Sequence, residues 1–153
     1  MKYRRLAMTD FGVYRGTQEF TFSRENGVWI VYGRNGRGKT TLLNAFRFAL
    51  YGTVLGRTAE PRSLAEVGSS QANDPRDTGQ APSFAVELDF AHAGSEYQLV
   101  RSFRNGSSTL QLARSGEMLS EDAAKREMLA VAPPSISQFF LFDGELLRQY
   151  EDL

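Results

Sequence analysis

The spacing of apolar and polar residues in the first third of the chain predicts strands followed by a helix. Residues 2–8 alternate loosely, as a first strand would, and residues 18–22 alternate as a half-buried strand does. Residues 28–32 (VWIVY) form a continuous β-prone run, which is typical of a fully buried strand. Residues 39–51 carry apolar side chains at helical spacing, and Gly52 is a plausible stop for that helix.

The second half of the chain predicts an antiparallel meander and then a helix. Residues 83–94, 96–106 and 108–119 all alternate, and glycine-containing turns separate them. Residues 120–132 begin with a Ser-x-x-Ala run that is typical of a helix cap, and the prolines of 133–137 break the helix that follows.

The chain ends on a second apolar run and a charged segment. Residues 138–142 (QFFLF) are predicted to form a strand or a buried segment, and residues 144–153 are predicted to begin a helix in which the chain stops. The abrupt helical end is more typical of a cut than of a finished domain.

These patterns divide the 153 residues into four parts within one domain. Residues 1–55 hold the first strands and helix, and residues 56–82 form a long loop rich in Gly, Pro, Ser, Asp and Asn, with one short helical turn at 63–67. Residues 83–130 hold the meander and its helix, and residues 136–153 hold the final segment.

Composition excludes several classes of protein. Lys and Arg together number 18, as do Asp and Glu, so any contact with nucleic acid must come from a local patch or another subunit. The absence of cysteine rules out disulfides and cysteine-based zinc sites. No signal peptide or run of 18 apolar residues is visible, so we expect a soluble, cytoplasmic protein without a membrane partner.

One sequence motif among these elements indicates a binding function. Residues 33–40 read GRNGRGKT, which is the G-x-x-x-x-G-K-T pattern of a phosphate-binding loop, and the motif lies between an apolar run and an amphipathic helix. Glycines let successive N–H groups point at one anion, and the helix N-terminus adds a partial positive charge. The Lys39 ammonium is expected to reach the β- and γ-phosphates of ATP, and the Thr40 hydroxyl to bind Mg²⁺.

We therefore expect ATP and Mg²⁺ as ligands. The predicted nucleotide-binding residues are Gly33, Asn35, Gly36, Arg37, Gly38, Lys39, Thr40 and Thr41. The side chains of Arg34 and Arg37 lie inside the loop and either touch phosphate or point into solvent.

The chain resembles the N-terminal lobe of the SMC-like, coiled-coil ABC ATPase heads, in particular the double-strand-break-repair branch. The resemblance rests on NGVWIVYGRNGRGKTTLLNAFRFALYG, on the opening LAMTDFGVYRG and on the meander VELDFAHAGSEYQLVRSF. The ending SQFFLFDGELL resembles DndD-like ATPases and related anti-phage ATPases such as those of Lamassu systems. The implied fold is an α/β P-loop NTPase lobe with an antiparallel β-subdomain and the start of a coiled-coil helix.

The resemblance also implies partners. A C-terminal lobe of the same ATPase would supply the signature motif, the Walker B acids and the switch histidine, none of which is recognisable in this chain. Two such heads would form a homodimer around two ATP molecules and drive a DNA clamp that a nuclease or effector subunit reads. This chain alone would then bind ATP without completing hydrolysis.

Asp143 ends the last apolar run and has three interpretations. The family resemblance places it at the Q-loop position, where it would lie beside the metal together with Thr40. Alternatively it is a Walker B acid, although Gly144 separates it from Glu145, or it is a structural turn residue. Gln138 is the other residue that could fill the Q-loop position.

Two further groups of residues are candidates for binding. Tyr14 and Arg15 stand where the family contacts adenine or ribose, or they form an exposed turn. A local DNA-facing patch is the alternative to ordinary solvated strand and helix faces for a set of basic residues. The set comprises Arg101, Arg104, Arg114, Lys125 and Arg126.

Two other functions remain compatible with the sequence. One is a free-standing P-loop kinase or NTPase in which Asp143 is the catalytic acid. The other is a nucleotide-binding assembly module that does not hydrolyse ATP.

Overall fold

The computed structural model describes residues 1–22, 27–34, 37–55, 62–64, 67 and 83–136. The predicted strand at 138–142 and the predicted helix at 144–153 lie outside these ranges, as does most of the predicted loop at 56–82. Within that loop, Leu64 and Val67 are helical, and the Val67 amide donates to the Ser63 carbonyl at 3.4 Å. This bond fits the short helical turn expected at 63–67.

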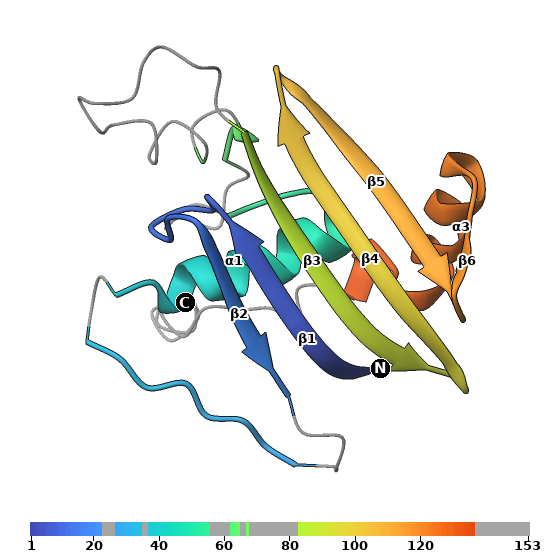
Figure 1. The fold of residues 1–153 in the computed structure, drawn as a ribbon, viewed down its shortest axis with the longest axis horizontal. Coiled ribbons are helices and arrows are strands. Elements are labelled where there is room, and N and C mark those ends of the chain that lie inside the picture. The colour runs from blue at the N-terminus through green and yellow to red at the C-terminus, as the bar shows by residue number, and fades with distance from the viewer. Residues whose placement is uncertain (23–26, 35–36, 56–61, 65–66, 68–82, 137–153) are drawn as a thin grey trace, which may run out of the picture.

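A six-stranded antiparallel sheet forms the centre of the molecule (Figure 1), in the order β2-β1-β3-β4-β5-β6. The strands are β1 (Lys2–Thr9), β2 (Thr17–Thr21), β3 (Ser83–His92), β4 (Ser95–Arg104), β5 (Ser107–Arg114) and β6 (Glu117–Met118). The predicted meander is confirmed as β3, β4 and β5. It joins the N-terminal strands because β1 pairs with β3, with Leu6 opposite Leu88.

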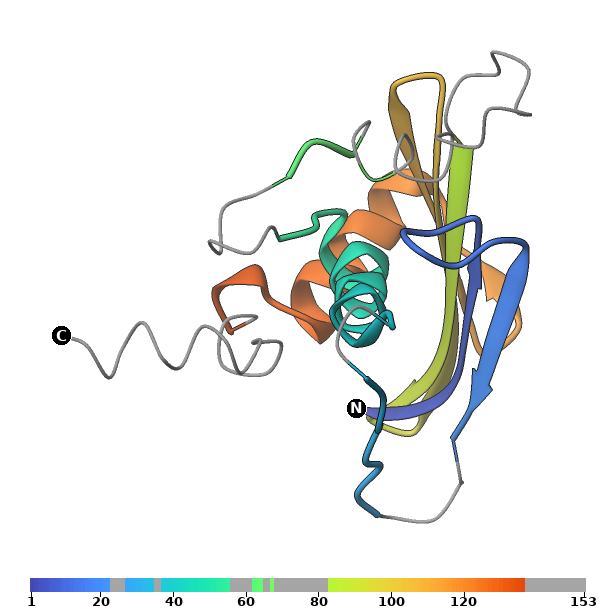
Figure 2. The same cartoon turned by 90° about the vertical axis from the view of Figure 1, so that its left-hand side faces the viewer.

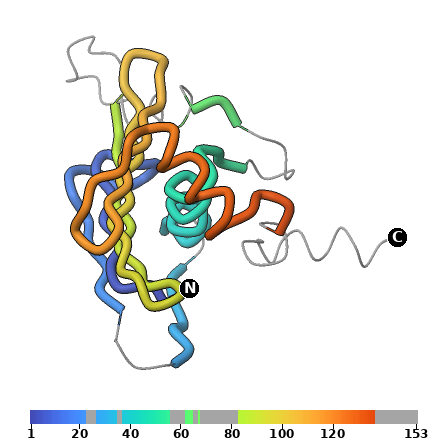
Figure 3. The backbone as a smooth tube through the Cα atoms, turned by 90° about the vertical axis from the view of Figure 1, so that its right-hand side faces the viewer, coloured from blue at the N-terminus to red at the C-terminus, as the bar shows by residue number. Residues whose placement is uncertain are grey.

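Among the described residues, the helices α1 (Lys39–Tyr51) and α3 (Glu121–Val131) cover one face of this sheet, as Figures 2 and 3 show. Helix α1 ends as expected at Gly52, whose φ of 71° is left-handed and suits glycine. Helix α3 begins after Ser120, whose hydroxyl accepts from the Ala123 amide at 3.4 Å. Neither helix is long and apolar enough to cross a membrane, which holds for the described part of the chain.

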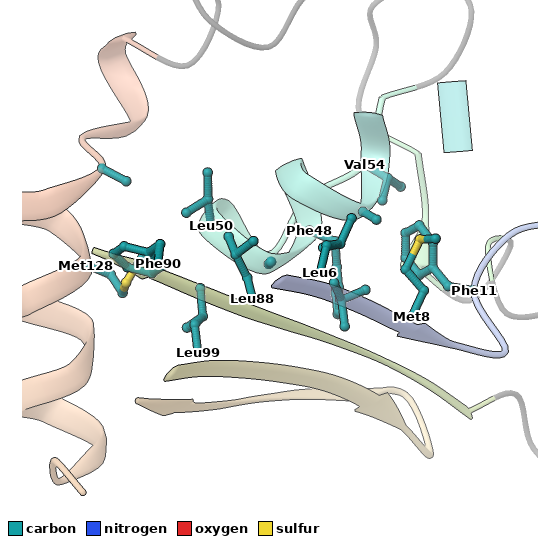
Figure 4. Close-up of a cluster of buried hydrophobic side chains, with 14 of the residues drawn as sticks. Leu6, Met8, Phe11, Phe48, Leu50, Val54, Leu88, Phe90, Leu99 and Met128 are labelled. Atoms are coloured by element: carbon teal, nitrogen blue, oxygen red, sulfur yellow. The ribbon is translucent and has the colours of Figure 1, made fainter. Parts of the chain in front are cut away.

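The hydrophobic core lies between these helices and the sheet (Figure 4). Alternate residues of β3 point into it, which is why Phe84, Val86, Leu88 and Phe90 are buried while their neighbours are not. The other large, fully buried side chains are Leu6, Met8, Phe11, Phe48, Val54, Leu99 and Leu112. The alternation read from the sequence thus places the core on a single face of the sheet.

The opposite face of the sheet is charged. The Arg5 guanidinium contacts the carboxylates of Glu19 at 2.8 Å, Glu87 at 2.9 Å and Asp89 at 3.8 Å. Partial burial raises the pKa of Asp89, and Arg5 counteracts that rise. These side chains come from β1, β2 and β3, so they link neighbouring strands on the face opposite to α1 and α3.

One predicted element is wrong. Residues 28–32 are not a buried strand; they lie outside the sheet, with 89 % of Val28 and 85 % of Tyr32 exposed (Figure 1). The physical reason is that a buried strand needs strands beside it, and none of the described residues pairs with this run. The apolar composition of VWIVY favours burial, but the described residues leave these side chains exposed.

The core assignment can be tested with a matched pair of leucines. Leu88 on β3 is fully buried, whereas Leu129 on α3 is 59 % exposed. Replacing Leu88 by Ala should lower the free energy of unfolding by about 2–5 kcal/mol, because burial is lost and a cavity remains. Leu129→Ala should change it by less than about 0.5 kcal/mol. Urea unfolding followed by circular dichroism measures both, and equal effects would contradict the placement of the core.

Candidate functional site

The N-terminus of α1 has the features of an anion-binding helix end. Its cap residue is Gly38, at φ 96°, which has no side chain to accept from the first-turn amides, and no acidic residue lies in that turn. The first backbone bond of the helix runs from the Leu42 amide to the Gly38 carbonyl at 2.9 Å. The positive end of the helix is therefore not neutralised by a capping side chain, which favours a negatively charged ligand.

Lys39 lies at this helix end and reaches back across the loop. Its ammonium donates to the Gly33 carbonyl at 2.6 Å and to the Arg34 carbonyl at 3.1 Å. The Arg37 amide donates to the same Arg34 carbonyl at 3.3 Å. The beginning of the loop and the beginning of α1 are thereby held close together, with an exposed cation between them.

The turn between β1 and β2, residues 10–16, forms a wall beside the loop. Its residues bond to one another: the Asp10 amide donates to the Gly16 carbonyl at 3.1 Å, and the Gly16 amide donates to the Asp10 carboxylate at 2.8 Å. The Tyr14 amide donates to the Phe11 carbonyl at 3.0 Å, and Phe11 is buried in the core. The turn is therefore held by its own hydrogen bonds and by the burial of Phe11 in the core.

This wall touches α1 at two places. A Cβ on Gly12 would clash with Cγ2 of Thr41, and a Cβ on Gly38 would lie 2.7 Å from the Tyr14 hydroxyl. The Tyr14 hydroxyl also donates to the Gly38 carbonyl, at 3.4 Å. Gly12 and Gly38 both have positive φ, so close approach and backbone conformation each require glycine at these positions.

The structure brings together the predicted site residues that it describes. At the N-terminal end of α1 lie Gly33, Arg37, Gly38, Lys39, Thr40 and Thr41. The other three, Asn35, Gly36 and Asp143, lie outside the described residues. The prediction that Thr40 and Asp143 share a metal ion therefore stays a prediction.

Sequence reasoning singled out Tyr14 but missed the contacts that place it. Tyr14 is half-buried against the cap of α1, while Arg15 beside it is exposed. The contact of Gly12 with Thr41 joins residues 29 positions apart, and only the glycine-rich composition of 10–16 hinted at it. A tyrosine ring at the edge of the loop is suited to contact a nucleotide base or ribose.

The residues present fit a magnesium nucleotide. Backbone amides at a helix N-terminus, an ammonium and a threonine hydroxyl form a donor set for phosphate oxygens and one metal ligand. Within the described ranges, no group of three or more His, Asp or Glu side chains could hold a metal ion by itself.

Three of the candidate DNA-contacting residues are engaged in contacts within the protein. Arg114 forms an ion pair with Glu127 at 3.3 Å, and Lys125 forms one with Glu121 at 2.6 Å. The Nε of Arg101 donates to a backbone carbonyl of α1. Exposed Arg104 and Arg126 complete the set. The structure thus favours ordinary strand and helix faces over a dedicated DNA-binding patch.

Comparison with known protein families identifies the chain. A family model described as an AAA domain matches residues 5–145, which covers the sheet, α1 and the phosphate-binding loop. The chain belongs to this AAA domain family. Its fold is that of the N-terminal lobe of an ABC-type ATPase head, with an antiparallel sheet packed on the loop-bearing helix.

Several curated proteins are similar in sequence. The DNA double-strand break repair Rad50 ATPase of Halobacterium salinarum is 34 % identical over 113 residues, which are 74 % of this chain and 11 % of the relative. The Rad50 ATPase of Thermoplasma acidophilum is 32 % identical over 101 residues, 63 % of this chain and 10 % of the relative. The SbcC component of the nuclease SbcCD of Treponema pallidum is 42 % identical over 60 residues, 39 % of this chain and 6 % of the relative.

These relatives confirm the resemblance to SMC-like ABC ATPase heads. The matches span about a tenth or less of the length of the relatives. The activities named for those proteins therefore belong to chains much longer than this one of 153 residues.

The contact between the wall and α1 can be tested with two glycines of the same turn. Gly12 and Gly16 both have positive φ, at 59° and 62°, but nothing lies within 4 Å of a Cβ on Gly16. Gly16→Ala should cost about 1 kcal/mol of unfolding free energy for backbone strain alone. Gly12→Ala should cost about 1–3 kcal/mol more, because the methyl group meets Thr41.

A second substitution identifies the cause. Thr41→Ser removes Cγ2, the atom that the new methyl group would meet, so it should restore part of the stability of Gly12→Ala. A double-mutant cycle measured by chemical unfolding gives this coupling energy. Strict additivity of the two substitutions would contradict the contact.

Proposed function

We propose that this chain is the ATP-binding half of an SMC-like ABC ATPase of the DNA-repair type. The observation that carries the proposal is the N-terminus of α1, which has a glycine cap, no capping side chain, no acid in the first turn, and Lys39 beside it. The AAA domain family and the Rad50 and SbcC relatives support ATP as the ligand.

Each residue of the site would have a definite role. Amides of the first turn of α1, together with those of the loop that includes Gly33 and Arg37, would bind the phosphates. Lys39 would exchange its two carbonyl contacts for phosphate oxygens, and Thr40 would bind Mg²⁺, which neutralises phosphate charge. Asn35 and Gly36 would complete the loop, and the wall with Tyr14 would limit the space for the base or ribose.

The exposed apolar run 28–32 supports the view that a second lobe completes this one. Its five large apolar side chains range from 51 % to 89 % exposed, and no described strand pairs with them. An unpaired apolar strand is costly in water and prone to aggregate. We propose that a strand of the C-terminal lobe pairs with this run, since the relatives are about ten times longer than the matched region.

The same proposal covers the assembly. Two heads would dimerise around ATP, and a nuclease or effector subunit would read the open and closed states on DNA. The names of the relatives support this, since one is a double-strand break repair ATPase and another is part of a nuclease. The ending at 137–147, which resembles DndD-like ATPases, favours anti-phage defence as the setting.

The first test is ATP binding and turnover by this chain with Mg²⁺. Lys39→Ala should weaken ATP binding about 10- to 100-fold, because a charge-assisted contact to phosphate contributes about 1.5–3 kcal/mol. Lys125→Ala, which removes an exposed lysine on α3, should leave the affinity unchanged. Calorimetry measures affinity, and phosphate release measures turnover.

Each outcome distinguishes one function from another. Binding without turnover, converted to turnover when the C-terminal lobe is added, supports the half-head. Turnover by this chain alone that is lost in Asp143→Ala would instead favour a free-standing NTPase. Binding that never leads to turnover would favour a nucleotide-binding assembly module.

Pairing of run 28–32 with the C-terminal lobe predicts a selective effect of a charge. Ile30 is 66 % exposed. Ile30→Asp should therefore change the free energy of unfolding of this chain by less than about 0.5 kcal/mol relative to wild type. It should weaken association with the C-terminal lobe at least 10-fold, because the carboxylate would be buried between strands. Leu129→Asp, at a similarly exposed position on α3, should not affect association. Equal weakening by both would contradict the proposed pairing.

A further inference from the structure

The C-terminal end of α1 is held by an arginine from the middle of the sheet. Arg101 lies on β4, opposite Val86 of β3 and Leu110 of β5, on the sheet face that carries the core. Its Nε donates to the Ala49 carbonyl at 3.0 Å. This carbonyl belongs to the last turn of α1, where intrahelical donors run out.

The guanidinium has an unusual electrostatic setting. Burial among apolar neighbours lowers the pKa of Arg101, and no carboxylate of the described residues lies within ion-pair distance of it. Its charge is compensated instead by the helix end, because α1 has no basic residue of its own in the last turn. Arg101 therefore acts on α1 rather than on an acidic partner.

Gly52 makes room for this contact. Its amide donates to the Phe48 carbonyl at 2.8 Å, and a Cβ at this position would lie 2.8 Å from Nη1 of Arg101. Two successive carbonyls of the last turn, those of Phe48 and Ala49, are thus satisfied by the Gly52 amide and by Arg101. The C-terminal end of α1 therefore packs directly against the Arg101 guanidinium.

We propose that Arg101 is a positioning residue for the nucleotide, acting through α1; this rests on the function proposed above. The 13 residues of α1 span about 20 Å, with the phosphate-binding end at Lys39 and the arginine contact at the other end. Arg101 fixes the position of the helix along its own axis relative to the sheet. The first-turn amides, the Thr40 hydroxyl and the Lys39 ammonium then stand at a fixed distance from the wall at 10–16.

The two ends of α1 are coupled energetically. An anion at the N-terminus and a cation at the C-terminus each stabilise the same placement of the helix. If Arg101 strengthens nucleotide binding, nucleotide binding must strengthen the Arg101 contact by the same factor. This reciprocity separates a positioning role from a purely structural one.

Arg114 provides a matched control. It lies on β5 on the same face of the sheet, its guanidinium is 5.9 Å from the centre of the Tyr97 ring, and it pairs with Glu127 of α3 at 3.3 Å. Arg114 thus anchors the other helix by comparable contacts without touching α1. Its loss should affect stability but not the nucleotide.

The experiment compares Arg101→Met, Arg101→Lys and Arg114→Met in the full-length protein, with wild type first shown to bind ATP and Mg²⁺. Arg101→Met should weaken ATP binding about threefold to tenfold, within the range that charges at helix ends contribute. Arg101→Lys keeps a charge but loses the Nε donor, so it should show a smaller loss. Arg114→Met should lower the melting temperature while changing ATP affinity less than twofold.

Hydrogen exchange supplies the reciprocal measurement. ATP should slow exchange of the Gly52 amide in wild type and in Arg114→Met, and should slow it less in Arg101→Met. If Arg101→Met does not fold, the same two measurements on Arg101→Lys decide.

Two results are unfavourable, and they differ from each other. Unchanged ATP affinity with a lowered melting temperature in the Arg101 variants would overturn the inference and leave the proposed function standing. Failure of the wild-type protein to bind ATP would overturn the proposed function itself, and it would be seen before any substitution is made.

Discussion

Three phenylalanine rings position the elements around the candidate site, which are α1, the sheet and the turn at 10–16. Phe48 of α1 lies 5.0 Å from Phe84 of β3 and 5.8 Å from Phe11 of the turn before β2, measured between ring centres, and Phe11 lies 5.3 Å from Phe84. Each such pair contributes about 0.5–1.5 kcal/mol beyond the burial of its area. These three rings therefore join α1, the sheet and the wall at 10–16. The position of the phosphate-binding loop depends on all three elements.

The sheet can hold α1 in this way because its two faces differ. Long-range pairing brings β1 next to β3, so Leu6 and Leu88 meet on the core face while Arg5 meets Glu87 on the other. A one-residue slip of β1 would exchange the two faces and place Arg5 under the helix. The ion pairs of the charged face and the contacts of the apolar face thus require the same register, and the position of α1 depends on that register.

Local features of the fold could be predicted from sequence, whereas contacts between distant segments could not. Alternation in β3 and the glycine at 52 act within a few residues, so the strand and the end of α1 were correctly foreseen. The contacts of Gly12 with Thr41 and of Arg101 with Ala49 depend on topology and register, and no local pattern encodes them. The candidate phosphate-binding residues were found because their chemistry is local: a glycine cap and Lys39 adjoin in sequence.

The error at 28–32 has the same origin. A continuous apolar run predicts a strand that is covered on both faces, but it does not identify the segments that cover it. In the described structure α1 covers a sheet that does not include this run, although the run leads directly into the loop. The loop therefore has one side fixed by the wall at 10–16 and the core beneath it, and the other side set by the exposed run. Gly33 directly follows this run, so any strand that paired with residues 28–32 would also constrain the backbone at the start of the loop.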